Sequence, residues 1–198
     1  MEKESVLIKS HSFNVCAVLI KHHKDGKITK KRFHGKNALT KSGEIYYAKI
    51  GARQMPPSDF VDQTNGRLVL RNMLAGIEED DNFADLTGHL TAKTTDYKPV
   101  SMGYPKTDDN DPDNVDDSEN PRGGPNIITY LYEWPKDDLV ANSIQGGGIV
   151  FKSADPPANS DPILNHFDII PIINKTAEDE LRIFINHSIN RVDPLLQQ

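Results

Sequence analysis

The amino-acid sequence predicts a mainly β protein, folded as an antiparallel β-sandwich or an open barrel with long loops. Two segments, Asn126–Trp134 and Leu181–Ile189, alternate their side chains with the period of two that is typical of a half-buried strand. A third segment, Val15–Ile20, is apolar at every position, which predicts a central strand that is buried on both faces. No helical pattern longer than about three turns is evident, so we expect no long helix.

The first strands are expected to form a hairpin. Phe13–Lys21 and Lys27–His34 are joined by a turn that contains Asp25-Gly26, and glycine adopts a positive φ at little cost there. Glu44–Ile50 is the next predicted strand. Arg67–Arg71 is either a short strand or the start of a short helix.

The later strands follow a polar segment. Alternation in Asn126–Trp134 places Tyr130, Tyr132 and Trp134 on one face of the strand. Gly146-Gly147-Gly148 is interpreted as a flexible lead into the strand that follows. Because Pro171 cannot donate a backbone hydrogen bond, we expect it at an edge or a bulge. The remaining predicted strands are Gly148–Lys152, Phe167–Ile173 and Leu181–His187.

The chain of 198 residues is interpreted as a single β-rich domain, residues 1–198. It has a basic N-terminal part, about residues 1–53, and a long acidic loop, about residues 94–125. The apolar run Val15–Ile20 is far shorter than the roughly 20 residues that cross a bilayer. Neither a membrane span nor a signal peptide is expected, so synthesis in a cytoplasm is the prediction.

The charge is distributed unevenly along the chain. Residues 1–53 carry a local charge of +8, and the remaining residues carry −14. The densest basic cluster is Lys27, Lys30, Lys31 and Arg32. It has no interleaved aromatic residues and no recognition helix follows it, so nucleic acid is not the expected partner. A surface for a complementary protein and a merely solvated hairpin both remain open.

The acidic loop contains one candidate metal site. Asp109, Asp111 and Asp113 stand at alternate positions, as in the opening of a calcium-binding loop. However, Asn114 replaces the expected glycine, and Asn120 stands where a bidentate glutamate is required. An ordered Ca²⁺ site and a solvated acidic loop are therefore the two interpretations, and no other cofactor is expected.

No catalytic residues are predicted, so we expect that the protein is not an enzyme. Its histidines are scattered or sit in a turn, and the sequence lacks a nucleophile elbow and a phosphate-binding loop. The single cysteine, Cys16, lies inside the apolar run, where a buried small side chain is expected rather than a reactive thiol.

Four segments, read in order, resemble those of tailed-bacteriophage virion proteins, in particular small β-rich tail, tail-fibre or baseplate-associated modules. They are GKNALTKSGEIYYAKI (Gly35–Ile50), ITYLYEWPKDD (Ile128–Asp138), SIQGGGIVF (Ser143–Phe151) and LNHFDIIPIINKTAEDELRIFINHSI (Leu164–Ile189). The residues that match the first and last elements of the family are Lys36, Asn37, Leu39, Gly43, Pro171, Ile172, Lys175, Thr176, Leu181 and Ile183. The chain departs from the family at Gly146-Gly147-Gly148-Ile149, where an acidic E-x-G-L motif is usual.

This resemblance implies a structural role in a virus particle, by docking on neighbouring subunits of the tail, fibre, baseplate or an adaptor. The implied partners are other virion proteins and further copies of the chain, and the implied location is the virion. The alternative is a β module that binds a carbohydrate or another ligand, with calcium in the acidic loop. In that alternative the face with Tyr130, Tyr132 and Trp134 is exposed as a row of rings.

Overall fold

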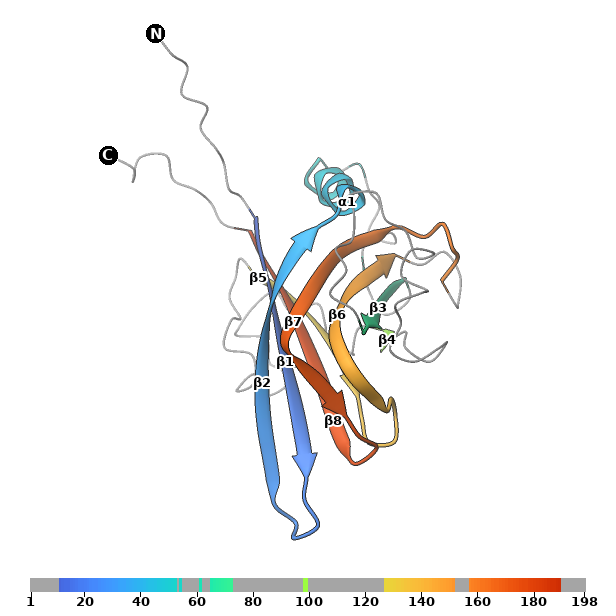
Figure 1. The fold of residues 1–198 in the computed structure, drawn as a ribbon. Helices are drawn as coiled ribbons and strands as arrows, with labels where there is room; N and C mark the ends of the chain where they lie inside the picture. Colours follow the sequence, from blue (N-terminus) through green and yellow to red (C-terminus); the bar gives the residue numbers. More distant parts are fainter. Residues whose placement is uncertain are drawn as a thin grey trace, which may run out of the picture.

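The computed structural model describes residues 11–52, 54, 61, 65–72, 98–99, 127–151 and 157–189. These residues form one α-helix and eight β-strands (Figure 1). The helix is α1 (Lys41–Gly51). The strands are β1 (His11–His22), β2 (Ile28–Leu39), β3 (Gly66–Arg71), β4 (Lys98–Pro99), β5 (Ile127–Trp134), β6 (Ala141–Phe151), β7 (Ile163–Lys175) and β8 (Asp179–Ile189).

All eight strands belong to one antiparallel sheet, in the order β4-β3-β6-β7-β2-β1-β8-β5. The sheet curls until its two outer strands approach each other, which nearly closes it into a barrel. An ion pair between Lys98 of β4 and Asp138, just after β5, spans this junction. The predicted fold class, mainly β and antiparallel, is confirmed, and the first and last strands share the sheet.

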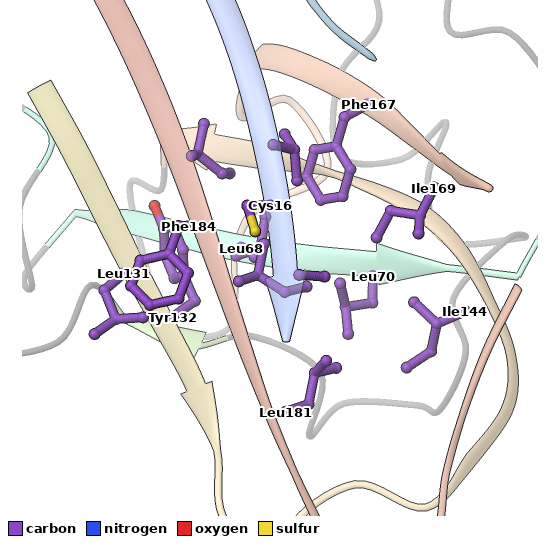
Figure 2. Packing of buried hydrophobic residues seen from close by; sticks show 14 of the residues in the cluster. Cys16, Leu68, Leu70, Leu131, Tyr132, Ile144, Phe167, Ile169, Leu181 and Phe184 are labelled. Carbon is purple, nitrogen blue, oxygen red and sulfur yellow. The ribbon is translucent and has the colours of Figure 1, made fainter. Parts of the chain in front are cut away.

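The hydrophobic core lies inside the curled sheet (Figure 2). Leu68 and Leu70 of β3 lie in it with Phe167 and Ile169 of β7. Strand β1 lies between β2 and β8 and is buried from residue 15 to residue 20, so the predicted central strand is confirmed. Cys16 is buried in this strand, as expected.

Strand β5 differs from the half-buried strand that the sequence pattern predicts. Tyr130, Tyr132 and Trp134 are buried, and so are Thr129 and Leu131 on the opposite face. The expectation of one solvated face is wrong because side chains of both alternating sets are covered.

The segment predicted as a strand over Glu44–Ile50 belongs instead to helix α1. Its β-branched and aromatic residues favour a strand, but Thr40 provides a helix N-cap. The Thr40 hydroxyl accepts a hydrogen bond from the Gly43 amide at 3.0 Å, and the Glu44 amide donates to the Thr40 carbonyl at 2.9 Å. The cap and the burial of Tyr46 prevail over the local β preference.

The three consecutive glycines are part of strand β6 rather than a flexible lead into it. Added Cβ atoms at Gly146 and Gly148 would lie 2.2 and 2.5 Å from carbonyl oxygens of β7, too close for a side chain. The glycines therefore permit a close approach of β7.

Residues 66–71 form strand β3. Of the two structures that the sequence left open for this segment, strand or helix, the strand is therefore the one that forms.

Pro171 lies inside β7, beyond the last residue of that strand that pairs with β2. The pairing of β7 with β6 shifts register next to it, between Ile144 and Gly146. The predicted bulge is confirmed, and on the β2 side Pro171 also stands at a local edge.

In the described part of the chain, no helix is long and apolar enough to span a membrane.

Candidate functional site

The hairpin β1–β2 carries a group of exposed charged side chains. Its turn is built as the sequence predicts, with Gly26 at a φ of 80° and the Lys27 amide donating to the Asp25 carboxylate at 3.0 Å. The His23 amide donates to the Lys27 carbonyl at 2.8 Å and closes the loop. Figure 1 shows the tip of this hairpin at the opposite end of the molecule from α1.

Cationic side chains line this hairpin. All five of its central basic residues are exposed, namely Lys24, Lys27, Lys30, Lys31 and Arg32. The Lys31 ammonium lies 5.0 Å from the centre of the buried Phe33 ring, a distance at which a cation is attracted by an aromatic face. The predicted basic cluster is therefore gathered on one exposed hairpin.

The hairpin is held firmly along its other side. Strand β1 pairs with β8 from His11 to Lys21, which is almost its whole length. Near the tip, His22 Nε2 and Glu180 Oε1 form a hydrogen bond of 2.7 Å. The cations of β2 are consequently displayed on a framework that is already ordered, which lowers the entropic cost of binding.

The aromatic side chains of β5 cannot form an exposed binding platform. Trp134 and Tyr132 are fully buried, and Tyr130 nearly so. Burial raises the pKa of Tyr130 and Tyr132 well above the usual value of a phenol. These rings stabilise the core instead of stacking on a ligand, which contradicts the arrangement required by the carbohydrate-binding alternative.

Tyr47 and His187 form a polar contact between α1 and β8. The Tyr47 hydroxyl and His187 Nδ1 form a hydrogen bond of 2.5 Å, and the two ring centres are 5.3 Å apart. Burial, followed by the nearby Tyr130, raises the pKa of Tyr47. The sequence separates these residues by 140 positions, so reasoning from sequence had no signal for the pair.

Among the described residues, Lys175 is the cationic side chain with the lowest exposed fraction, and its ammonium has three hydrogen-bond acceptors. Its ammonium donates to the carbonyls of Pro135 and Leu139 at 3.1 Å and to that of Thr176 at 3.4 Å. Burial lowers the pKa of Lys175, and Asp138 and Asp179 partly oppose that shift. Because backbone carbonyls occupy all three donors, Lys175 fastens the β5–β6 turn and has no donor left for a substrate.

A shallow hollow of about 260 Å³ lies beside Trp134. Its walls include Arg182 and Glu133, which pair with each other at 3.1 Å, and Glu180, which bonds His22. The charged side chains that line this hollow pair with one another or with His22. This arrangement is typical of a surface that stabilises the fold.

The described residues contain no group of three or more side chains that could hold a metal ion. Asp109, Asp111 and Asp113 lie outside the described residues, as does most of the predicted acidic loop. The calcium site stays a prediction.

Comparisons with known proteins identify no relative: no family model, curated protein or solved structure matches this chain.

Proposed function

We propose that this protein is a structural component of a bacteriophage virion and works by docking on neighbouring protein subunits. The observation that carries the proposal is the exposed basic hairpin β1–β2 on its ordered framework. The resemblance of residues 35–189 to tail, tail-fibre and baseplate-associated modules suggests which assembly the protein belongs to, namely the tail, fibre or baseplate of a virion. The protein is synthesised in the host cytoplasm and then incorporated, as a homo-oligomer or beside other virion proteins, without an enzymatic role.

Electrostatic steering is the physical basis of the docking. The exposed cations of the hairpin attract an acidic surface of a neighbouring subunit; they are Lys24, Lys27, Lys30, Lys31 and Arg32. Exposed charges of this kind set the rate and the register of association more than its affinity. Salt weakens them, because the Debye length falls from about 10 Å at 0.1 M to about 3 Å at 1 M.

The first experiment is mass spectrometry of purified particles. We expect this chain to be present in the particles in a fixed ratio to the other components. It should remain after washing with high salt, because contacts buried in a finished assembly are screened by salt much less than exposed ones. A particle preparation that lacks the chain would overturn the proposal.

The second experiment reverses the hairpin charge. We expect the triple variant Lys30→Glu, Lys31→Glu and Arg32→Glu to fold normally but to enter particles at least about tenfold less often, because attraction becomes repulsion. The matched control makes the same charge change at the exposed residues Lys41, Lys49 and Lys136. Equal incorporation of both triple variants would show that the hairpin is only a solvated surface.

A further inference from the structure

The first part of β6 borders a hollow at the surface of the molecule. Residues 141–144 of this strand pair only with β7 among the described strands, because the pairing of β6 with β3 begins at Gly146. A hollow of about 280 Å³ lies beside this part of the strand, and we call it the β6 hollow. Its described walls are Asn72, Val140, Ala141, Asn142 and Ser143. The hollow is therefore built from the start of β6 and from the residue that follows β3.

The backbone of β6 is strained at this hollow. Ser143 has a φ of 149°, in a region that glycine adopts readily and that is costly for other residues. The register with β7 shifts between Asn142 and Ile144, where β6 has one residue more than its partner strand. An extra residue of this kind is a β-bulge, and bulges often re-aim side chains next to functional sites. The bulge allows Asn142 and Ser143, which are neighbours in sequence, to line the same hollow.

The walls of the β6 hollow are held in place before any ligand arrives. The side-chain amide of Gln145 donates to the backbone carbonyl of Asn72 at 2.9 Å, which ties the residue after β3 to β6. Ala141, another part of the wall, pairs with Lys175 of β7 and is buried. A site that is ordered in advance loses less conformational entropy when a ligand binds.

The described walls of the β6 hollow carry no charged side chain. They offer the amides of Asn72 and Asn142 and the hydroxyl of Ser143, and each of these side chains both donates and accepts hydrogen bonds. Val140 adds apolar surface, since 59% of this residue is exposed. An ion finds no opposite charge among these groups. A neutral molecule that has both hydroxyl groups and C–H faces finds matching chemistry.

An extended peptide is a poorer match to this edge of β6. Addition of a strand requires a regular row of backbone donors and acceptors along the edge. The bulge at Ser143 interrupts that row, and bulges are among the devices that protect strand edges from pairing with other chains. The edge therefore favours a small ligand that is recognised by side chains.

We infer that the β6 hollow binds one sugar residue of a neutral carbohydrate. Asn72, Asn142 and Ser143 form hydrogen bonds with the sugar hydroxyls, and Val140 packs on a C–H face of the ring. A few polar groups that fix orientation beside an apolar contact are common in small-molecule sites. The site requires no calcium and is separate from the buried rings of β5. In a virion it would attach the particle to a glycan, but the chemistry of the site does not depend on the proposed function.

The test is an NMR titration of the isotope-labelled full chain with neutral sugars, namely glucose, galactose, mannose, N-acetylglucosamine and maltotriose. We expect at least one of them to bind with a dissociation constant in the millimolar range and to shift the amide signals of Asn72 and residues 140–145. Absence of these shifts for all five sugars at concentrations on the order of 0.1 M would overturn the inference.

An alanine variant tests the location of the site. Asn142 is exposed, so Asn142→Ala should keep its circular dichroism and melting temperature while the affinity for the sugar falls at least about fivefold. Asn174→Ala is the matched control. It removes an exposed amide that pairs with Asn142 across the ladder but is not among the described residues that line the hollow. Equal affinities of the two variants would place the sugar elsewhere and contradict the inference.

A glycine variant separates binding from folding at the strained position. Ser143→Gly relieves the unfavourable φ, so its melting temperature should equal or exceed that of the native protein. Loss of the hydroxyl should at the same time weaken sugar binding at least about threefold. A purely structural role of Ser143 predicts the opposite result, namely a lower melting temperature with unchanged sugar affinity, and that result would count against the site.

Discussion

Gly147 shows how a missing side chain permits close packing of β3 and the Phe167 ring against β6. A Cβ atom at this position would lie 2.5 Å from the Val69 carbonyl oxygen and 2.9 Å from Cζ of Phe167. The Phe167 ring is fully buried and packs over the glycine, so neither neighbour can move without disturbing the core.

We therefore expect Gly147→Ala to destabilise the protein by about 1–3 kcal/mol, the usual cost of overpacking. Asn142→Ala, at an exposed position of the same strand, is the control and should change stability by less than about 0.5 kcal/mol. Urea unfolding of both variants measures the difference, and similar midpoints would contradict this view of Gly147.

Lys175 acts on the backbone of a strained turn. Asp137 and Leu139 have φ values of 60° and 53°, a conformation that is costly for residues other than glycine. The Lys175 ammonium bonds to the carbonyl of Leu139 itself, and thereby holds the turn in this conformation.

Replacing the lysine by methionine leaves the buried carbonyl of Leu139 and the partly buried carbonyls of Pro135 and Thr176 without their donor. We expect Lys175→Met to cost about 1–3 kcal/mol of folding stability and to speed amide hydrogen exchange in residues 136–141. Lys136→Met, on the exposed surface of the same turn, is the matched control. Unchanged exchange in the turn of Lys175→Met would show that other contacts hold it.

At the scale of elements, the attachment of α1 to the sheet depends on its first turn. Thr40 caps the helix and also donates from its hydroxyl to the carbonyl of Ile163 in β7. Gly43 lies directly against the backbone of Leu164, where a Cβ would overlap the carbonyl oxygen. The cap and the glycine thus place the helix over the start of β7.

We expect Thr40→Ala to destabilise the protein by about 1–2 kcal/mol because it removes both hydrogen bonds of the hydroxyl. Thr40→Ser keeps the hydroxyl and should retain most of the stability. Thermal unfolding distinguishes the two variants; a serine variant as unstable as the alanine variant would assign the effect to the lost methyl group.

At the scale of the whole molecule, the buried tyrosines make folding sensitive to alkali. Burial raises the pKa of Tyr47, Tyr130 and Tyr132 in the folded state above the value of about 10 in the unfolded chain. Above pH 10 the folded state therefore binds more protons than the unfolded state, and stability falls as pH rises. The lowered pKa of Lys175 acts in the opposite direction, but only below about 10.5, so the three tyrosines govern the change of stability above that pH.

We expect stability to be independent of these tyrosines below about pH 10 and to fall above it, by up to about 1.4 kcal/mol per pH unit for each tyrosine. Tyrosinate absorbance and Trp134 fluorescence should change together as the protein unfolds. Tyr132→Phe should make the decline shallower. Ionisation of every tyrosine while Trp134 fluorescence stays native would contradict the burial of these phenols.

The sequence by itself determined the β class, the central position of β1, the turn at Asp25-Gly26 and the basic character of the first hairpin. Each of these follows from local chemistry, namely side-chain alternation, an unbroken apolar run, a positive φ and a concentration of charge. Local patterns of this kind are readable because they do not depend on distant parts of the chain.

Only the tertiary structure decided the helix over Lys41–Gly51, the burial of both faces of β5 and the point at which the pairing of β2 with β7 ends. The physical reason is that each depends on contacts between residues far apart in sequence. The Thr40 hydroxyl donates to a carbonyl of β7, and Tyr47 forms a hydrogen bond with His187. The pairing of β2 with β7 ends at His34. Such contacts override local preference and leave no periodic trace in the sequence.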